Sequence, residues 1–273
     1  MSKHPHEVPA GPRLSREAGR ALFGTDPDGY ENGRLGYPTQ LYEWVLKPIA
    51  ERSSTIVEIG PGTGLATVDL LAADPALLFA IEPDAALAAH MRRRFASTAV
   101  TVVEADFLSA PVPGPVDLFA SAASFHWLDP VPALTRMRTL LARNGRIAFW
   151  WNVYRQPGIG DPLADAILPL LEGIELPPSE GATGHYSLDI RLHQQQLGQA
   201  GFALELQHVF RRERMLTTGQ VLALYASYSF VRALPDSDRA TLLAAIGALV
   251  ETVFGGIAPN VELTPLYIAR LAF

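Results

Sequence analysis

The sequence predicts an α/β protein whose sheet is mainly parallel and is covered by helices on both faces. Between residues 55 and 151, short apolar segments alternate with segments in which apolar residues recur at helical spacing. The short segments are almost uninterrupted, which is typical of parallel strands buried on both sides. A length of 273 residues suits one large domain, or one domain with a subdomain.

The first half of the chain contains a regular succession of predicted elements. A helix is expected after Pro38, with Leu41 and Val45 on one face. We predict strands at 55–59, 76–81, 100–103, 116–121 and 147–151. The helices between them are predicted at 67–73, 84–95 and 131–142, and Asn144-Gly145 is expected to end the last one.

The second half is less regular. Residues 153–190 mix Pro, Gly and acidic residues around a helical segment at 162–171, which indicates an insertion. The remaining predicted elements are a helix at 191–200, a strand at 202–210, helices at 218–232 and 237–254, and a strand at 265–271. We therefore expect an amino-terminal segment and lid at 1–50, a binding core at 51–152, a cap insertion at 153–190, and the rest of the core at 191–273 with a helical cap insertion at about 215–258.

Composition and charge exclude several classes of function. The chain has no cysteine, which excludes disulfides, Cys-bound zinc, iron–sulfur clusters and thiol nucleophiles. Its 22 Lys and Arg against 28 Asp and Glu give a net charge of −6, which argues against nucleic acid as the main partner. The start lacks the apolar segment of a secretory signal, and the longest charge-free run is too polar for a membrane span. We expect a cytoplasmic protein with no membrane partner.

A glycine loop follows the first predicted strand. Residues 58–64 read Glu-Ile-Gly-Pro-Gly-Thr-Gly, and glycines allow a sharp turn and the close approach of a ligand. The N–H groups at the start of the next helix could hold a polar ligand. The dinucleotide pattern G-x-G-x-x-G fails here, because its third glycine would fall on Leu65 or Thr67.

Acidic residues end the next two strands. Glu82 follows the second strand, and a carboxylate there can accept both hydroxyls of an adenosine ribose. The third strand ends in Glu104-Ala105-Asp106-Phe107, where an acid and an aromatic ring could bind adenine. Because the three features occur at three successive strand ends, they indicate an adenosine-containing cofactor.

Taken together, the motifs VEIGPGTG, IEPD, EADF and ASAASFHWLDP resemble those of the class I S-adenosylmethionine-dependent methyltransferases. The small-molecule branch that includes trans-aconitate methyltransferases is the most similar. The resemblance covers residues 23–151 well and the last strand weakly. It implies a Rossmann-like sheet of seven strands, six parallel and the last antiparallel, with a helical cap. It also implies S-adenosylmethionine as the cofactor, and it leaves the methyl acceptor open.

The resemblance also implies which residues bind the cofactor. The glycine loop would pass under the methionine and ribose, Glu82 would bind the ribose hydroxyls, and Asp106 would meet the adenine amine. Arg34 could pair with the methionine carboxylate, or alternatively cap a surface helix while the nearby tyrosines only pack. The expected cofactor residues are Tyr30, Arg34, Glu58, Gly60, Pro61, Gly62, Gly64, Glu82, Pro83, Ala105, Asp106, Phe107, Ser121 and Ala122.

His126 is the candidate catalytic residue. It follows the fourth strand, at the carboxyl edge where open α/β sheets form their sites. Methyl transfer is an in-line displacement that needs an aligned nucleophile, so a base is helpful and not obligatory. His126 could take a proton near neutral pH, or it could only position the methionine end of the cofactor or form a hydrogen bond to the lid.

The methyl acceptor is expected to be a small molecule held under the cap. Residues that could face it are Trp151, Tyr186, Tyr225, Tyr228 and Arg232. An arginine could bind a carboxylate or phosphate group of the acceptor. The sequence does not predict which arginine faces the acceptor among Arg155, Arg191, Arg211, Arg212 and Arg232. His193 is expected to be an exposed helix residue, and the histidines show no metal-binding spacing.

Two other functions stay open at this point. One is a nicotinamide-dependent oxidoreductase, which the failed third glycine disfavours. The other is a protein that binds S-adenosylmethionine without catalysing a reaction. Neither the oligomeric state nor the acceptor atom can be predicted.

Overall fold

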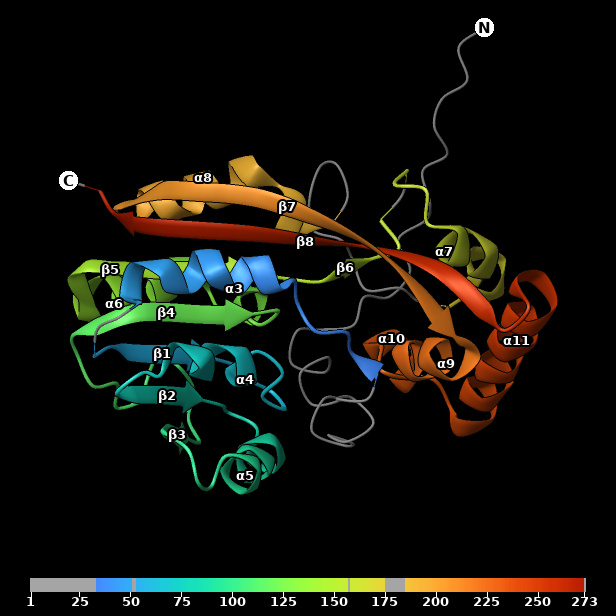
Figure 1. Cartoon of the computed structure of the whole chain (residues 1–273), viewed down its shortest axis with the longest axis horizontal. Coiled ribbons are helices and arrows are strands. Elements are labelled where there is room, and N and C mark those ends of the chain that lie inside the picture. The colour runs from blue at the N-terminus through green and yellow to red at the C-terminus, as the bar shows by residue number, and fades with distance from the viewer. Residues whose placement is uncertain (1–32, 51–52, 157, 175–184, 273) are drawn as a thin grey trace, which may run out of the picture.

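The computed structural model describes residues 33–50, 53–156, 158–174 and 185–272. Within these residues a single sheet has the strand order β3-β2-β1-β4-β5-β8, with β7 on the far edge of β8 (Figure 1). The strands are β1 (Thr55–Ile59), β2 (Leu77–Ile81), β3 (Val100–Val103), β4 (Val116–Ala122), β5 (Leu141–Trp150), β6 (Val153–Tyr154), β7 (Phe202–Thr217) and β8 (Ile257–Leu271).

Strand directions confirm the predicted sheet. Strands β1 to β5 are parallel to one another, and β8 is antiparallel to both β5 and β7. Of the seven predicted strands, six therefore run one way and the last runs the other way. The two-residue β6 is an addition that the sequence did not predict, and it pairs with β8 where β5 ends.

Helices cover both faces of the sheet. One core lies between the strands and α3 (Thr39–Leu46), α4 (Thr67–Leu70) and α5 (Ala85–Arg94). A second core lies between the opposite face and α6 (Pro130–Leu140) and α8 (Ile190–Gln199). Alternate residues of β1 divide between them, with Ile56 in the first core and Val57 in the second.

The end of α6 differs from the prediction. The helix stops at Leu140, and Asn144-Gly145 lies inside β5 instead of capping the helix. A Cβ at Gly145 would lie 2.8 Å from the side chain of Leu141 and 2.9 Å from the Val116 carbonyl oxygen. The glycine is therefore explained by close packing of β5 against β4, and not by a helix terminus.

Strands β7 and β8 form a long two-stranded arm that carries a helical cap, as Figure 1 shows. The cap consists of α7 (Pro162–Ile167), α9 (Thr218–Ala226), α10 (Ser229–Arg232) and α11 (Asp236–Phe254), which share their own apolar core. The helix predicted over 218–232 is interrupted at Ser227, whose hydroxyl donates to the Leu224 carbonyl at 2.6 Å.

Five 3₁₀ turns complete the described elements. They are η2 (Lys47–Ile49), η3 (Leu71–Ala73), η4 (Phe125–Trp127), η5 (Leu168–Leu171) and η6 (Tyr186–Leu188). None of the helices in the described part of the chain combines the length and the apolarity that crossing a lipid bilayer requires.

Candidate cofactor and acceptor site

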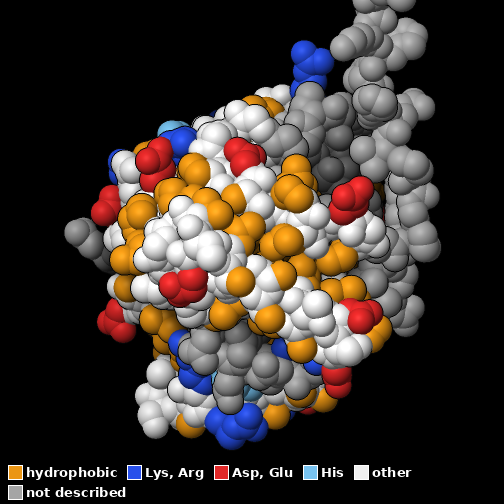
Figure 2. Space-filling view, turned by 90° about the vertical axis from the view of Figure 1, so that its right-hand side faces the viewer, with side chains coloured by type: hydrophobic (Ala, Val, Ile, Leu, Met, Phe, Trp, Pro, Cys, Tyr) orange, Lys and Arg blue, Asp and Glu red, His pale blue; other side chains and the backbone are white. Residues whose placement is uncertain are grey.

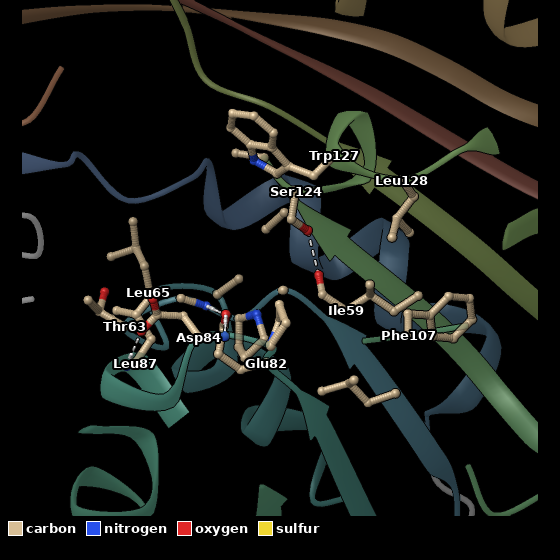
Figure 3. Close-up of a pocket in the computed structure, with 18 of the residues that line it drawn as sticks. Ile59, Thr63, Leu65, Glu82, Asp84, Leu87, Phe107, Ser124, Trp127 and Leu128 are labelled. Atoms are coloured by element: carbon tan, nitrogen blue, oxygen red, sulfur yellow. Dashed lines mark hydrogen bonds between the residues drawn. The ribbon is translucent and has the colours of Figure 1, made fainter. Parts of the chain in front are cut away.

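A cavity lies at the carboxyl ends of β1, β2 and β4, above the glycine loop (Figure 3). The sheet positions it there because parallel strands deliver their ends, and the loops that follow, to one edge. Predicted cofactor residues that line it are Gly60, Pro61, Gly62, Glu82, Pro83, Phe107 and Ala122.

The three glycines of the loop have different surroundings. All have positive φ: 63° at Gly60, 61° at Gly62 and 89° at Gly64. A Cβ on Gly60 would lie 2.6 Å from Cβ of Ser124, and one on Gly64 would lie 2.5 Å from the ring of Phe95. A Cβ on Gly62 would meet no atom within 4 Å. Gly62 is therefore the glycine that leaves room for a ligand in the cavity.

Glu82 forms the polar part of the cavity wall. Its Oε2 accepts a hydrogen bond from the Gly62 N–H at 3.0 Å, and its Oε1 accepts one from the Asp84 N–H, also at 3.0 Å. Asp84 in turn caps α5 by accepting from the N–H groups of Ala86 and Leu87. The carboxylate is thus fixed at the cavity with only 5% of the residue exposed (Figure 3).

Glu58 lies buried beneath the same loop and does not line the cavity. Its Oε2 accepts from the Thr67 hydroxyl at 2.6 Å, while its Oε1 has no hydrogen-bond partner among the described residues. Burial raises the pKa of the Glu58 carboxyl to about 7, against the lowering effect of Thr67, and the nearby charge of Glu82 adds to the rise.

The opposite wall comes from the end of β4 and the turn that follows. The hydroxyl of Ser124 donates to the Ile59 carbonyl, and the Ser121 and Ser124 hydroxyls are 2.6 Å apart (Figure 3). Ser124 lines the cavity, whereas Ser121 is fully buried behind it. Ala123 has a φ of 51°, a conformation that few residues other than glycine adopt.

Several predicted cofactor residues are not among the lining residues. Asp106 is exposed, and its Oδ1 accepts from the Leu108 N–H. Arg34 lies against the cap, where it donates to the Ser227 carbonyl at 3.3 Å. Gly64 and Ala105 also lie away from the cavity surface, and Tyr30 is outside the described residues. Tyr37, three residues after Arg34, does line the cavity.

His126 lies beside the cavity, in η4, and is held by Trp151. The Trp151 Nε1–H donates to Nδ1 of His126 at 3.3 Å. Since the indole nitrogen can only donate, Nδ1 acts as the acceptor and the proton of the neutral ring sits on Nε2. The ring also packs against Trp127 and against Tyr186, a predicted acceptor residue.

Trp151 belongs to a buried cluster of aromatic and histidine rings. Its indole stacks on His193 at a centroid distance of 5.4 Å. The prediction that His193 is exposed is wrong: the residue is 4% exposed, because its face of α8 packs on β5 and β8. Burial lowers the pKa of His193 to about 4, and the pKa of His185 also to about 4.

The other predicted acceptor residues lie in the cap. Tyr225 and Tyr228 are buried in the cap core with their rings 5.3 Å apart, and Arg232 ends α10. None of the three lines the cavity above the glycine loop.

Some lining residues were not predicted. Thr63, Asp84 and Trp127 lie inside the quoted motifs, so their spacing from the loop, the acid and His126 could have identified them. Leu65 and Leu87 have no such signal, because only the packing of α5 against the loop brings them to the cavity. No cluster suited to a metal ion occurs among the residues that the structure describes.

Comparison of the chain with known proteins finds a matching family model and similar sequences. Residues 57–149 match the family model described as a methyltransferase domain. The chain is 24% identical over 233 residues to an uncharacterized methyltransferase of Schizosaccharomyces pombe, covering 85% of this chain and 88% of the relative. A second S. pombe methyltransferase-like protein is also 24% identical, over 238 residues, with coverage of 85% and 86%.

Solved structures share the fold at low identity. One from Anaeromyxobacter dehalogenans, which carries the provisional name type II methyltransferase, has a TM-score of 0.61 and 19% identity, covering 86% of this chain and 96% of that chain. A methyltransferase from Thiobacillus denitrificans, solved with S-adenosylhomocysteine, has a TM-score of 0.51 and 12% identity, with coverage of 88% and 93%.

Proposed function

We propose that this chain is a class I S-adenosylmethionine-dependent methyltransferase that transfers the methyl group of S-adenosylmethionine to a small molecule. The observation that carries the proposal is the cavity in which Gly62 leaves open space beside the fixed carboxylate of Glu82. The structure of the Thiobacillus denitrificans relative with S-adenosylhomocysteine supports the choice of cofactor.

The residues around the cavity fit the cofactor. Glu82 would accept hydrogen bonds from the ribose hydroxyls, since each oxygen of a carboxylate can accept more than one hydrogen bond. Pro83 and Phe107 give the cavity an apolar side that suits adenine. Glu58 would lie near the cofactor amine, and a positive charge there would offset the buried carboxyl.

The chemistry needs little from the protein beyond alignment. The cofactor, when bound, supplies a methyl group already activated on a sulfonium. The chain holds the acceptor in line and excludes water. Since Nδ1 of His126 accepts from Trp151, we assign His126 a positioning role through its Nε2–H, in preference to the base role.

Charge and surface support a small acceptor. The net charge of −6 gives no general attraction for phosphate backbones. On the cap end of the molecule, hydrophobic side chains and scattered Asp and Glu are spread over the described surface, and Lys and Arg form no continuous stripe there (Figure 2).

A label-transfer experiment tests the proposal. The protein is incubated with methyl-labelled S-adenosylmethionine and a cell extract, and the products are separated by size. We expect label in the low-molecular-mass fraction. Label confined to protein or nucleic acid would overturn the small-molecule assignment. In a separate calorimetric titration, we expect His126→Ala to bind S-adenosylhomocysteine more weakly than the wild type does, because the residue positions the cofactor. Lost turnover at unchanged affinity would instead assign His126 the base role.

A further inference from the structure

Arg155 follows β6 and packs against the aromatic core of the cap. Its guanidinium carbon lies 5.3 Å from the ring centre of Tyr228 and 4.7 Å from that of Phe230. The guanidinium of Arg34 lies 5.1 Å from the ring of the same Tyr228. Two cations therefore meet on one buried tyrosine, which concentrates positive charge at this point of the cap.

Arg155 has no anionic partner in the described part of the chain. The carboxylates nearby already have partners, since Glu262 pairs with Arg212 and Arg214, and Asp161 accepts from Asn260 and from the start of α7. Nε of Arg155 is buried without an acceptor among the described residues. Buried polar atoms normally have a hydrogen-bond partner, and the described residues provide none for this Nε–H.

The hydroxyl of Tyr228 is a second polar group for which the described residues provide no partner. The residue is 6% exposed, and its hydroxyl oxygen is buried with no hydrogen bond to any described residue. A buried hydroxyl that lacks a partner destabilises the protein unless a ligand satisfies it. The two unsatisfied groups belong to side chains in contact, so a single ligand group can serve both.

The backbone at Arg155 is strained. Its φ of 56° lies in the left-handed region, which a long side chain rarely adopts. Glycine or asparagine would relieve this strain, yet the position carries the arginine. Backbone strain of this kind is typically found where the orientation of a side chain matters for function.

Arg155 is also close enough to the cavity to serve the same acceptor. The Ala123 N–H at the cavity donates to the Trp150 carbonyl at 2.8 Å, and Arg155 follows Trp150 by five positions. Five residues span at most about 18 Å. The proposal needs an acceptor that spans this distance, with its methylated atom in the cavity and another group at the guanidinium.

We propose that Arg155, together with the Tyr228 hydroxyl, binds an anionic oxygen group of the methyl acceptor, a carboxylate or a phosphate. This proposal rests on the proposed function for its acceptor, and the anion site itself can be tested without turnover. The planar guanidinium donates two parallel hydrogen bonds to such a group, and the tyrosine hydroxyl adds a third. The bound group is remote from the methylated atom.

The test uses two anions as probes. Glutarate and inorganic phosphate are titrated by calorimetry into the full-length protein, with and without saturating S-adenosylhomocysteine. We expect the wild type to bind at least one of them, and Arg155→Gln to bind it at least about tenfold more weakly. Arg155→Lys should fall between the two. The matched control is Arg143→Gln, because Arg143 is exposed on β5 near its amino end and should leave anion affinity unchanged.

A second variant separates binding from folding. Tyr228→Phe removes only the unsatisfied hydroxyl, so it should weaken anion binding several-fold without lowering the melting temperature of the ligand-free protein. Binding of glutarate alone assigns a carboxylate, and binding of phosphate alone assigns a phosphate. The proposal is overturned if the wild type binds neither anion or if Arg155→Gln binds both as well as the wild type. Failure to bind S-adenosylhomocysteine, with the Arg155 effect intact, would instead refute the proposed function.

Discussion

Gly62 and Gly64 are two residues apart in one loop, yet a methyl group would meet different surroundings at each. At Gly62 it would enter open space in the cavity, whereas at Gly64 it would meet Phe95 and Met91, which are both buried. Both residues have positive φ, so either change to alanine carries a backbone strain of about 1 kcal/mol.

The two alanine variants should therefore differ in which property they lose, ligand affinity or folding stability. Gly62→Ala should weaken S-adenosylhomocysteine binding at least about tenfold with a loss of only about 1 kcal/mol in the free energy of unfolding. Gly64→Ala should lose about 2–4 kcal/mol, because overpacking adds to the strain. Calorimetry and urea unfolding measure the two quantities. Equal losses of affinity and stability in both variants would contradict the assignment of Gly62 to the ligand.

Glu58 makes stability depend on pH. Its pKa is raised from 4.5 to about 7 by burial, so the folded state binds a proton more tightly than the unfolded state does. The stabilisation from the protonated carboxyl is complete below about pH 4.5 and is lost as the pH rises through about 7. The free energy of unfolding contributed by this residue should fall by about 2 kcal/mol between pH 5 and pH 8.

Glu58→Gln removes that dependence. The glutamine carbonyl can still accept the hydrogen bond from Thr67, while the titrating group is gone. Urea unfolding of the ligand-free variant should show a smaller decline from pH 5 to pH 8 than the wild type, and a higher stability at pH 8. An unchanged pH dependence would show that Glu58 ionises normally in the folded protein.

At the scale of elements, the segment before α3 connects the cavity to the cap. Gly33 packs directly on α9, where a Cβ would collide with the Ala223 carbonyl oxygen and lie 2.9 Å from Cβ of Ser227. Gly36 has nothing within 4 Å of the same position. Asn152 fixes the middle of the segment by donating to the Leu35 carbonyl at 2.8 Å.

These two glycines form a matched pair. Gly33→Ala should lower the free energy of unfolding by about 2 kcal/mol or more, because the obstacle is backbone that cannot move aside. Gly36→Ala should change it by less than about 1 kcal/mol. Thermal unfolding of both variants measures the difference. If Gly33→Ala is as stable as Gly36→Ala, the contact between this segment and α9 does not hold in solution.

The elements also show which features a sequence can predict. The bounds of β1 and β3 match the prediction, because their apolar runs end at turn residues. The prediction stopped β7 at Phe210, since the residues that follow include Arg211, Arg212, Glu213 and Arg214. Their strand partner is β8, in which Glu262 takes ion pairs from Arg212 and Arg214, and no local pattern reveals a partner some fifty residues away.

The candidate site likewise contains residues that the sequence predicts and residues whose positions it does not predict. Gly60, Gly62, Glu82 and Phe107, which motif spacing predicts, line one cavity. Pro83 and Ala122, which the family resemblance implies, line the same cavity. The burial of His193 and the position of Arg34 against the cap depend on how α8 and α9 pack, which motif spacing does not encode.

At the scale of the whole molecule, one sheet supports the cavity and the cap at different places. The carboxyl edge of β1, β2 and β4 holds the apolar cavity with Glu82, and the β7–β8 arm carries the cap (Figure 1). Arg155, after β6, contacts Tyr228 of the cap, where we propose the anion site. The absence of cysteine excludes methylation that needs a thiol nucleophile or a cysteine-bound cluster, and the net charge of −6 supports the proposal of an acceptor other than nucleic acid.

The most direct test of the central claim is calorimetric titration of the protein with S-adenosylhomocysteine and, separately, with NADH. The account predicts one S-adenosylhomocysteine site and no binding of NADH. Glu82→Gln should weaken that site at least about tenfold, and the exposed Glu104→Gln serves as the matched control with unchanged affinity. Binding of NADH in place of S-adenosylhomocysteine, or full affinity in Glu82→Gln, would contradict the account.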